Sequence, residues 1–212
     1  MKNILIIPTY LPSITTMAHI AQADQVVFEL KDNYQKQSYR NRTYINTANG
    51  SLGLTIPIRH NQASGHKKTS DALIENNFLW QRQHWRSIQI AYRSSPFFEF
   101  YEDDLAPLYT TGQKFLQEFN LKSIKLLLNM MEISKNIEFT TSYEQNPKLL
   151  NRRALANAKN KNTFVAIPKY DQVFADTTGF NPQVSILDLI FNEGPNSKNF
   201  LNSIELGLGQ GG

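Results

Sequence analysis

The pattern that most constrains the fold is a buried strand, a short helix and a second buried strand within the first thirty residues. Residues 3–7 form a short apolar run that Pro8 closes, which predicts a buried strand. Ser13 precedes residues 14–23, where apolar side chains recur on one face, as in a helix with a serine N-cap. Residues 25–30 predict the second strand. This order predicts an α/β fold with a Rossmann-like mixed sheet flanked by helices.

The rest of the chain continues this mixture, and its C-terminal half is predicted to be helical. Two alternating runs around Asn49-Gly50 predict a hairpin with a type I′ turn. The other expected elements are helices over residues 77–92, 113–133 and 147–158, and strands over residues 137–141 and 163–167. We expect one domain over residues 1–195 and a polar, flexible tail over residues 196–212.

Composition narrows the chemistry and the compartment. The sequence has no cysteine, which excludes disulfides, thiolate metal sites and cysteine nucleophiles and fits a reducing compartment. The apolar run at residues 4–7 is too short for the core of a signal peptide. No apolar stretch approaches the roughly 18 residues of a membrane span. We therefore expect a cytoplasmic protein.

The densest group of directional polar side chains lies in residues 32–42, DNYQKQSYRNR. It holds three cations and two asparagines, which are Lys36, Arg40, Arg42, Asn33 and Asn41. Arginine presents a planar fork to phosphate or carboxylate, lysine a point charge, and asparagine fixes orientation. The cluster predicts a site for an anionic small molecule, and the alternative is a structural network of salt bridges and turns.

Two loops are expected to meet at such a site. Residues 8–13, which include Tyr10, and residues 32–42 each follow a predicted strand. Ligands of open α/β sheets bind beyond the carboxyl ends of the strands. We therefore expect both loops to face one crevice.

His84 is the candidate general base, because it lies in an apparently ordered helix and a neutral imidazole titrates near working pH. The alternative is that it packs beside Trp80. The histidines at 19, 60, 66 and 84 lack the spacing of a metal motif, and we read Asp103-Asp104 as a solvated surface. No metal site is predicted, and no cofactor can be named.

A nucleic-acid partner is not favoured. Tyr34 and Tyr39 lie among the cations of residues 32–42 and could stack on bases. The net charge is only +4, however, and nucleic-acid-binding domains usually carry a stronger basic stripe. A phosphorylated or nucleotide-linked small molecule is the expected partner, and the sequence does not indicate an oligomeric state.

Several ordered motifs resemble the WbqC-like protein family. They are PTYLPS at residues 8–13, AQAD at 21–24, QKQSYRNR at 35–42, LTIPI at 54–58, WQRQHWRSIQIAY at 80–92, SPFFEFYEDDL at 95–105 and SILDLIFNEGP at 185–195. The resemblance implies a bacterial protein of O-antigen or other surface-polysaccharide (lipopolysaccharide) biosynthesis. It also implies transfer of an acyl or aminoacyl group to an amino sugar in its nucleotide-linked form.

The chain departs from the family pattern at two places. Many members begin with His-Gln-Pro-x-Tyr, and here Ile6 and Ile7 stand at the His and Gln positions. Many also carry a Tyr-Leu-Ser-Gly stretch after a late strand, which is not found near residues 164–170. These departures leave open whether activity is retained, and they favour a non-catalytic binding or scaffold protein as the alternative function.

Residue roles follow from the cluster and the resemblance together. Lys36, Arg40 and Arg42 would hold phosphate or carboxylate, and Tyr10, Asn33 and Asn41 would orient the sugar. His84 would accept the proton of the attacking amine, since a protonated amine is not a nucleophile.

Overall fold

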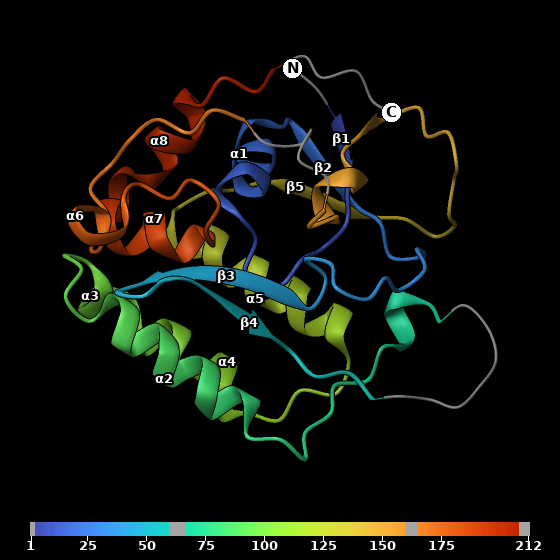
Figure 1. Ribbon diagram of the computed structural model, residues 1–212. Helices are drawn as coiled ribbons and strands as arrows, with labels where there is room; N and C mark the ends of the chain where they lie inside the picture. Colours follow the sequence, from blue (N-terminus) through green and yellow to red (C-terminus); the bar gives the residue numbers. More distant parts are fainter. Residues whose placement is uncertain (1–2, 60–66, 160–164, 208–212) are drawn as a thin grey trace.

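A four-stranded parallel sheet with strand order β5-β2-β1-β6 lies at the centre of the computed structural model, which describes residues 3–59, 67–159 and 165–207 (Figure 1). Its strands are β1 (Asn3–Ile6), β2 (Gln25–Phe28), β5 (Asn136–Phe139) and β6 (Leu150–Asn151). All three pairings are parallel. The predicted α/β class is confirmed.

The central strand is buried on both faces, as expected for a parallel sheet covered by other elements. Ile4, Leu5 and Ile6 are each at most 3% exposed. The crossover from β1 to β2 is helix α1 (Ile14–Gln22), and the Ser13 hydroxyl accepts a hydrogen bond from the backbone N–H of Thr16 at its start. The strand, cap, helix and strand predicted from the first thirty residues are all present.

An antiparallel hairpin forms a second, separate sheet. It consists of β3 (Arg42–Thr47) and β4 (Gly50–Thr55), and Thr47 pairs with Gly50. Gly50 takes a φ of +91°, but Asn49 does not adopt a positive φ. The hairpin is therefore confirmed, whereas its predicted type I′ turn is wrong because that turn needs positive φ at both central residues.

Helices cover the rest of the molecule, with α2 and α4 on the side of the hairpin away from the sheet and α7 and α8 near α1 (Figure 1). They are α2 (Trp80–Tyr92), α3 (Phe98–Leu105), α4 (Pro107–Thr110), α5 (Leu116–Met130), α6 (Ala175–Thr178), α7 (Ile186–Glu193) and α8 (Ser197–Ser203). Short 3-10 turns are η1 (Thr69–Asp71), η2 (Arg153–Ala156) and η4 (Gly194–Asn196). In the described part of the chain, none of these helices combines the length and apolar character of a membrane span.

The predicted flexible tail is wrong for its first part. Helix α8 occupies residues 197–203, and Leu201 and Ile204 are at most 2% exposed. The Gln22 side chain donates to the backbone carbonyls of both residues at 2.8 Å. The buried side chains of Leu201 and Ile204 therefore hold this segment against the core next to α1, although most of its residues are polar. Residues 208–212 lie outside the described residues.

One predicted element is wrong near the second half of the sheet, and another is absent from its described part. Residues 147–158 form β6 and η2 instead of a helix, because the open edge of β1 pairs with Leu150 and Asn151. The backbone N–H of Arg152 also donates to the Leu5 carbonyl at 2.8 Å. Of the strand expected at 163–167, residues 165–167 are described and join no ladder, and the rest lies outside the described residues.

Candidate functional site

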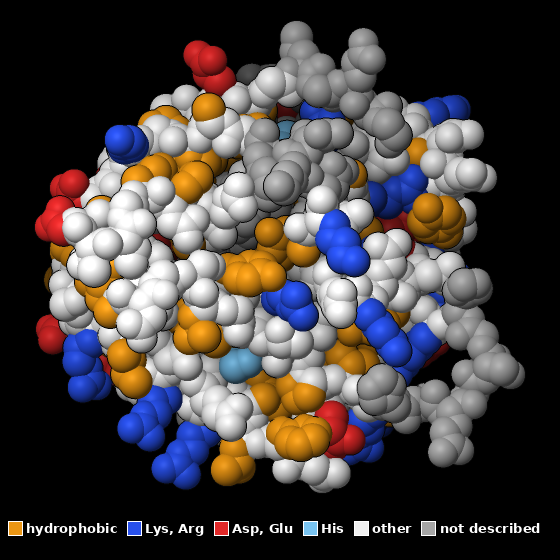
Figure 2. Space-filling view, viewed as in Figure 1, with side chains coloured by type: hydrophobic (Ala, Val, Ile, Leu, Met, Phe, Trp, Pro, Cys, Tyr) orange, Lys and Arg blue, Asp and Glu red, His pale blue; other side chains and the backbone are white. Residues whose placement is uncertain are grey.

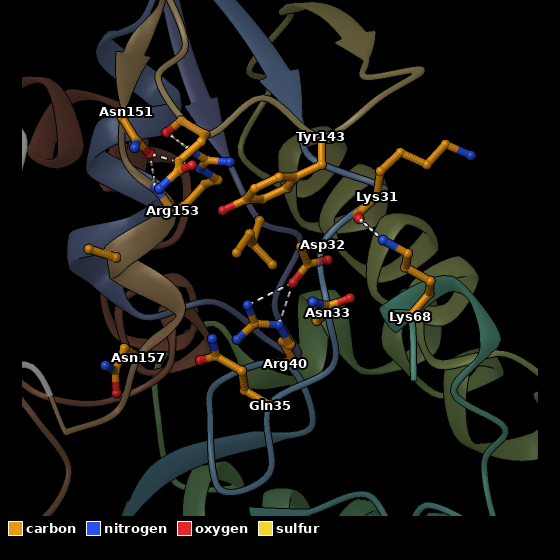
Figure 3. A pocket seen from close by; sticks show the side chains of 13 residues that line it. Lys31, Asp32, Asn33, Gln35, Arg40, Lys68, Tyr143, Asn151, Arg153 and Asn157 are labelled. Carbon is orange, nitrogen blue, oxygen red and sulfur yellow. Dashed lines mark hydrogen bonds and ion pairs between the residues drawn. The ribbon is translucent and has the colours of Figure 1, made fainter. Parts of the chain in front are cut away.

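A pocket of about 460 Å³ opens beyond the carboxyl ends of β1, β2 and β6 (Figure 3). We call it the Asp32 pocket. Figure 2 shows lysine and arginine side chains gathered on this face, over the segments near β2 and η1. The pocket is lined by Ile7, Lys31, Asp32, Asn33, Gln35, Arg40, Lys68, Tyr143, Gln145, Asn151, Arg153, Ala154 and Asn157.

A buried ion pair between Asp32 and Arg40 forms part of the wall (Figure 3). The Arg40 Nη2 and Nε atoms lie 2.7 and 2.8 Å from Asp32 Oδ2, and the two side chains are only 3% and 5% exposed. Arg40 Nη1 donates to the Ser38 hydroxyl. Asp32 Oδ1 is buried and has no hydrogen-bond partner among the described residues. The charge of Arg40 is therefore neutralised by Asp32, and Asp32 Oδ1 is left without a hydrogen bond to any described residue.

Two exposed lysines supply the charge of this pocket that no carboxylate neutralises. Lys68 is positioned by backbone pairing, because Asn33 and Lys68 form an antiparallel bridge and Thr69 N–H donates to the Asp32 carbonyl. Lys68 Nζ donates to the Lys31 carbonyl at 3.1 Å. Neither ammonium takes part in an ion pair within the described ranges. Figure 3 shows Lys68 Nζ against the Lys31 carbonyl, whereas the Lys31 side chain extends away from Asp32 and Arg40. Lys68 is therefore the better placed of the two to bind an anionic ligand.

Arg153 holds the opposite wall together. Its Nε donates to Asn151 Oδ1 at 3.1 Å, and its Nη1 lies 3.4 Å from Glu29 Oε2. The same guanidinium donates to the carbonyls of Glu144 and Gln145 and lies 4.6 Å from the Tyr143 ring centroid. Arg153 thus ties residues 143–145 to the ends of β2 and β6.

The structure separates the residues of the predicted cluster. Asn33 and Arg40 line the Asp32 pocket, whereas the exposed Lys36 does not. Asn41 is buried and donates to the Ile56 carbonyl at 2.9 Å. Arg42 lies on β3, where its Nε donates to Thr55 Oγ1. Part of the 32–42 segment therefore faces the pocket, and part of it joins the hairpin to the core.

Tyr10 and His84 lie together in a different, closed place. The Tyr10 hydroxyl is 2.9 Å from His84 Nδ1 and 3.0 Å from the Tyr109 hydroxyl, and none of the three lines the Asp32 pocket. His84 also bonds to the backbone of Thr55, and burial lowers its pKa to about 4. The imidazole is therefore neutral at working pH.

Sequence reasoning missed several lining residues. Lys31 directly follows the predicted strand at 25–30, so the strand-end rule could have included it. Arg153 and Asn151 were placed on a predicted helix, and nothing local marks β6. Lys68 comes from a basic loop whose residues 60–66, with His60 and His66, lie outside the described residues.

The described residues contain no group of three His, Cys, Asp or Glu side chains that could hold a metal ion. The Asp32 pocket offers lysine ammonium groups, side-chain amides and one carboxylate. This donor set suits an organic phosphate with hydroxyl or amino substituents.

Comparison with known proteins gives a family and a relative. The profile of the WbqC-like protein family matches residues 8–163. The uncharacterized protein Rv1507c of Mycobacterium tuberculosis is 27% identical over 230 aligned residues, which cover 95% of this chain and 98% of the relative. No solved structure matches the chain significantly.

Proposed function

Because the chain belongs to the WbqC-like protein family, we propose that it is an acyl- or aminoacyl-transferase that acts on a nucleotide-linked amino sugar. Its role would be in the biosynthesis of a bacterial surface polysaccharide such as O-antigen. The observation that carries this proposal is the Asp32 pocket, in which Lys31 and Lys68 lie beyond the carboxyl ends of parallel strands. Ligands of this fold class bind at that edge of the sheet.

Different lining residues of the pocket would bind different parts of such a ligand. Lys68 would contact the diphosphate, and Lys31 would do so after its side chain turned toward the pocket, since neither ammonium group is neutralised by a carboxylate in the described structure. The amides of Asn33, Gln35 and Asn157 line the same pocket and would hydrogen-bond to sugar hydroxyls. Arg40 would act indirectly, by fixing the Asp32 carboxylate.

Acyl transfer needs a proton acceptor. The sugar amine attacks the acyl carbonyl carbon, the C–N bond forms, and the bond to the leaving group breaks with its electron pair. The amine proton must pass to a base. Asp32 lines the pocket, and its Oδ1 is buried without a hydrogen-bond partner in the described structure. We assign Asp32 this role on the condition that the bound amine reaches that buried oxygen. The role of His84 stays a prediction that its position does not support.

The alternative is a non-catalytic protein that binds an anionic ligand or partner at the same pocket. The closed surroundings of His84 favour it, because the expected base does not reach the pocket. Turnover with an acyl donor separates the two functions, since a scaffold would bind the sugar nucleotide without consuming it.

Calorimetric titration with UDP-glucosamine and other nucleotide-linked amino sugars tests the proposal. Lys68→Met should weaken binding about tenfold, as expected for one lost charge-assisted contact. Arg82→Met is the matched control, because Arg82 is an exposed cation on α2 that does not line the pocket. The proposal fails if no nucleotide-linked sugar binds, or if both variants weaken binding equally.

A further inference from the structure

A second cavity of about 410 Å³ lies beside the Asp32 pocket. We call it the Lys148 cavity. It also opens at the carboxyl edge of the sheet, near the ends of β2 and β5. Its lining residues are Leu5, Glu29, Phe139, Thr140, Thr141, Ser142, Glu144, Pro147, Lys148 and Leu149.

Residues 142–145 form the wall between the two cavities. Ser142 and Glu144 line the Lys148 cavity, whereas Tyr143 and Gln145 line the Asp32 pocket. This segment lies between β5 and β6 and bends at residues 142 and 145, so the alternation rests on which cavity each residue lines. The wall is therefore a single segment of chain, and ligands in the two cavities would be neighbours.

An ion pair crosses from one cavity to the other. Glu29 lines the Lys148 cavity, Arg153 lines the Asp32 pocket, and Arg153 Nη1 lies 3.4 Å from Glu29 Oε2. Glu29 Oε1 accepts hydrogen bonds from the Thr140 hydroxyl and from the Lys31 N–H. The Glu29 carboxylate is thus already satisfied and supports the wall.

The Lys148 cavity keeps one free charge of each sign. The Glu144 carboxylate and the Lys148 ammonium are exposed, and neither forms an ion pair within the described ranges. The hydroxyls of Thr141 and Ser142 and the apolar side chain of Phe139 complete the surroundings. A polyphosphate would meet two carboxylates here and one lysine, whereas a zwitterion would find a partner for each of its charges.

We propose that the Lys148 cavity binds an α-amino acid, with its ammonium group against Glu144 and its carboxyl oxygens against Lys148. The inference goes beyond the proposed function and does not make this amino acid the group transferred, because its carboxylate carries no leaving group and residues 142–145 separate it from the Asp32 pocket. The sugar nucleotide and the amino acid would then lie on either side of residues 142–145.

Ligand-observed NMR with each of the common L-amino acids tests the inference. We expect at least one to bind at millimolar concentration, and its N-acetyl derivative, which lacks the ammonium charge, to bind at least tenfold more weakly. Glu144→Gln and Lys148→Met should each weaken binding about tenfold. Both side chains are exposed, so thermal melting should confirm that these variants fold like the wild type.

Lys68→Met serves as the crossed control, because Lys68 lines the other cavity. This variant should weaken binding of the sugar nucleotide and leave the affinity for the amino acid unchanged. The inference is overturned if no amino acid binds, or if neither Glu144→Gln nor Lys148→Met changes the affinity for it. Amino-acid binding without any sugar-nucleotide binding would instead defeat the proposed function and leave the second site standing.

Discussion

The Asp32 pocket and the closed Tyr10–His84–Tyr109 cluster both contain residues of the predicted site. They differ in whether charged side chains are exposed to a ligand. In the pocket, Asp32 and Arg40 are almost wholly buried and pair with each other, while Lys31 and Lys68 remain exposed. In the cluster, burial lowers the pKa of His84 to about 4. Residue type alone suggested chemistry at both places, but only the pocket gives a ligand access to charge.

The largest effect is expected from breaking the buried pair of the pocket. Arg40→Met leaves the Asp32 carboxylate buried without its cation, which should lower the free energy of unfolding by about 3–5 kcal/mol. Urea unfolding followed by circular dichroism measures this. The double variant Asp32→Leu/Arg40→Met should recover part of the loss. A loss in Arg40→Met no greater than in Arg82→Met would mean that the pair does not hold the wall.

Acid should act on the closed cluster. The folded pKa of His84 is about 4 and its ordinary value is 6.5, so folding favours the neutral ring. That contribution is complete above pH 6.5 and is lost as the pH falls toward 4, by on the order of 3 kcal/mol. His19 has a similarly lowered pKa, from burial and from nearby Arg152, and adds to the same slope.

His84→Gln isolates the share of His84. Its unfolding free energy should fall less steeply between pH 6.5 and 4 than that of the wild type, while the share of His19 persists. Urea titrations at a series of pH values in that range provide the comparison. Parallel curves for the two proteins would show that His84 does not resist protonation in the folded state.

A smaller effect is expected from removing one hydroxyl of the cluster. Tyr10→Phe deletes the hydrogen bonds to His84 and Tyr109 and should lower the free energy of unfolding by about 1–3 kcal/mol. The affinity for a nucleotide-linked sugar should stay within a factor of two of wild type, since Tyr10 does not line the pocket. A large loss of affinity at unchanged stability would show that Tyr10 takes part in binding the sugar.

The sequence predicted the elements whose signals are local. The β1–α1–β2 unit, the hairpin and the long helices follow from periodicity and from a serine cap. Strand β6 has only two residues and depends on the free edge of β1, which lies far away in the chain. Pro147 instead suggested the start of a helix, and that error hid Asn151 and Arg153.

The site could be predicted only in part for the same reason. Asn33 and Arg40 were found because they follow a strand and gather within one short segment. Lys68 reaches the pocket through backbone pairing with Asn33, and Tyr143 through the return of the chain after β5. The sequence also could not predict side-chain exposure, because a short stretch of sequence does not show that Tyr10 and His84 are buried.

The alternation of residues 142–145 makes the length of this segment as important as its composition. Inserting or deleting one residue there would change which side chains face the two cavities, because neighbouring residues of this segment line opposite cavities. Homologues that share this arrangement should therefore tolerate substitutions here more readily than single-residue gaps.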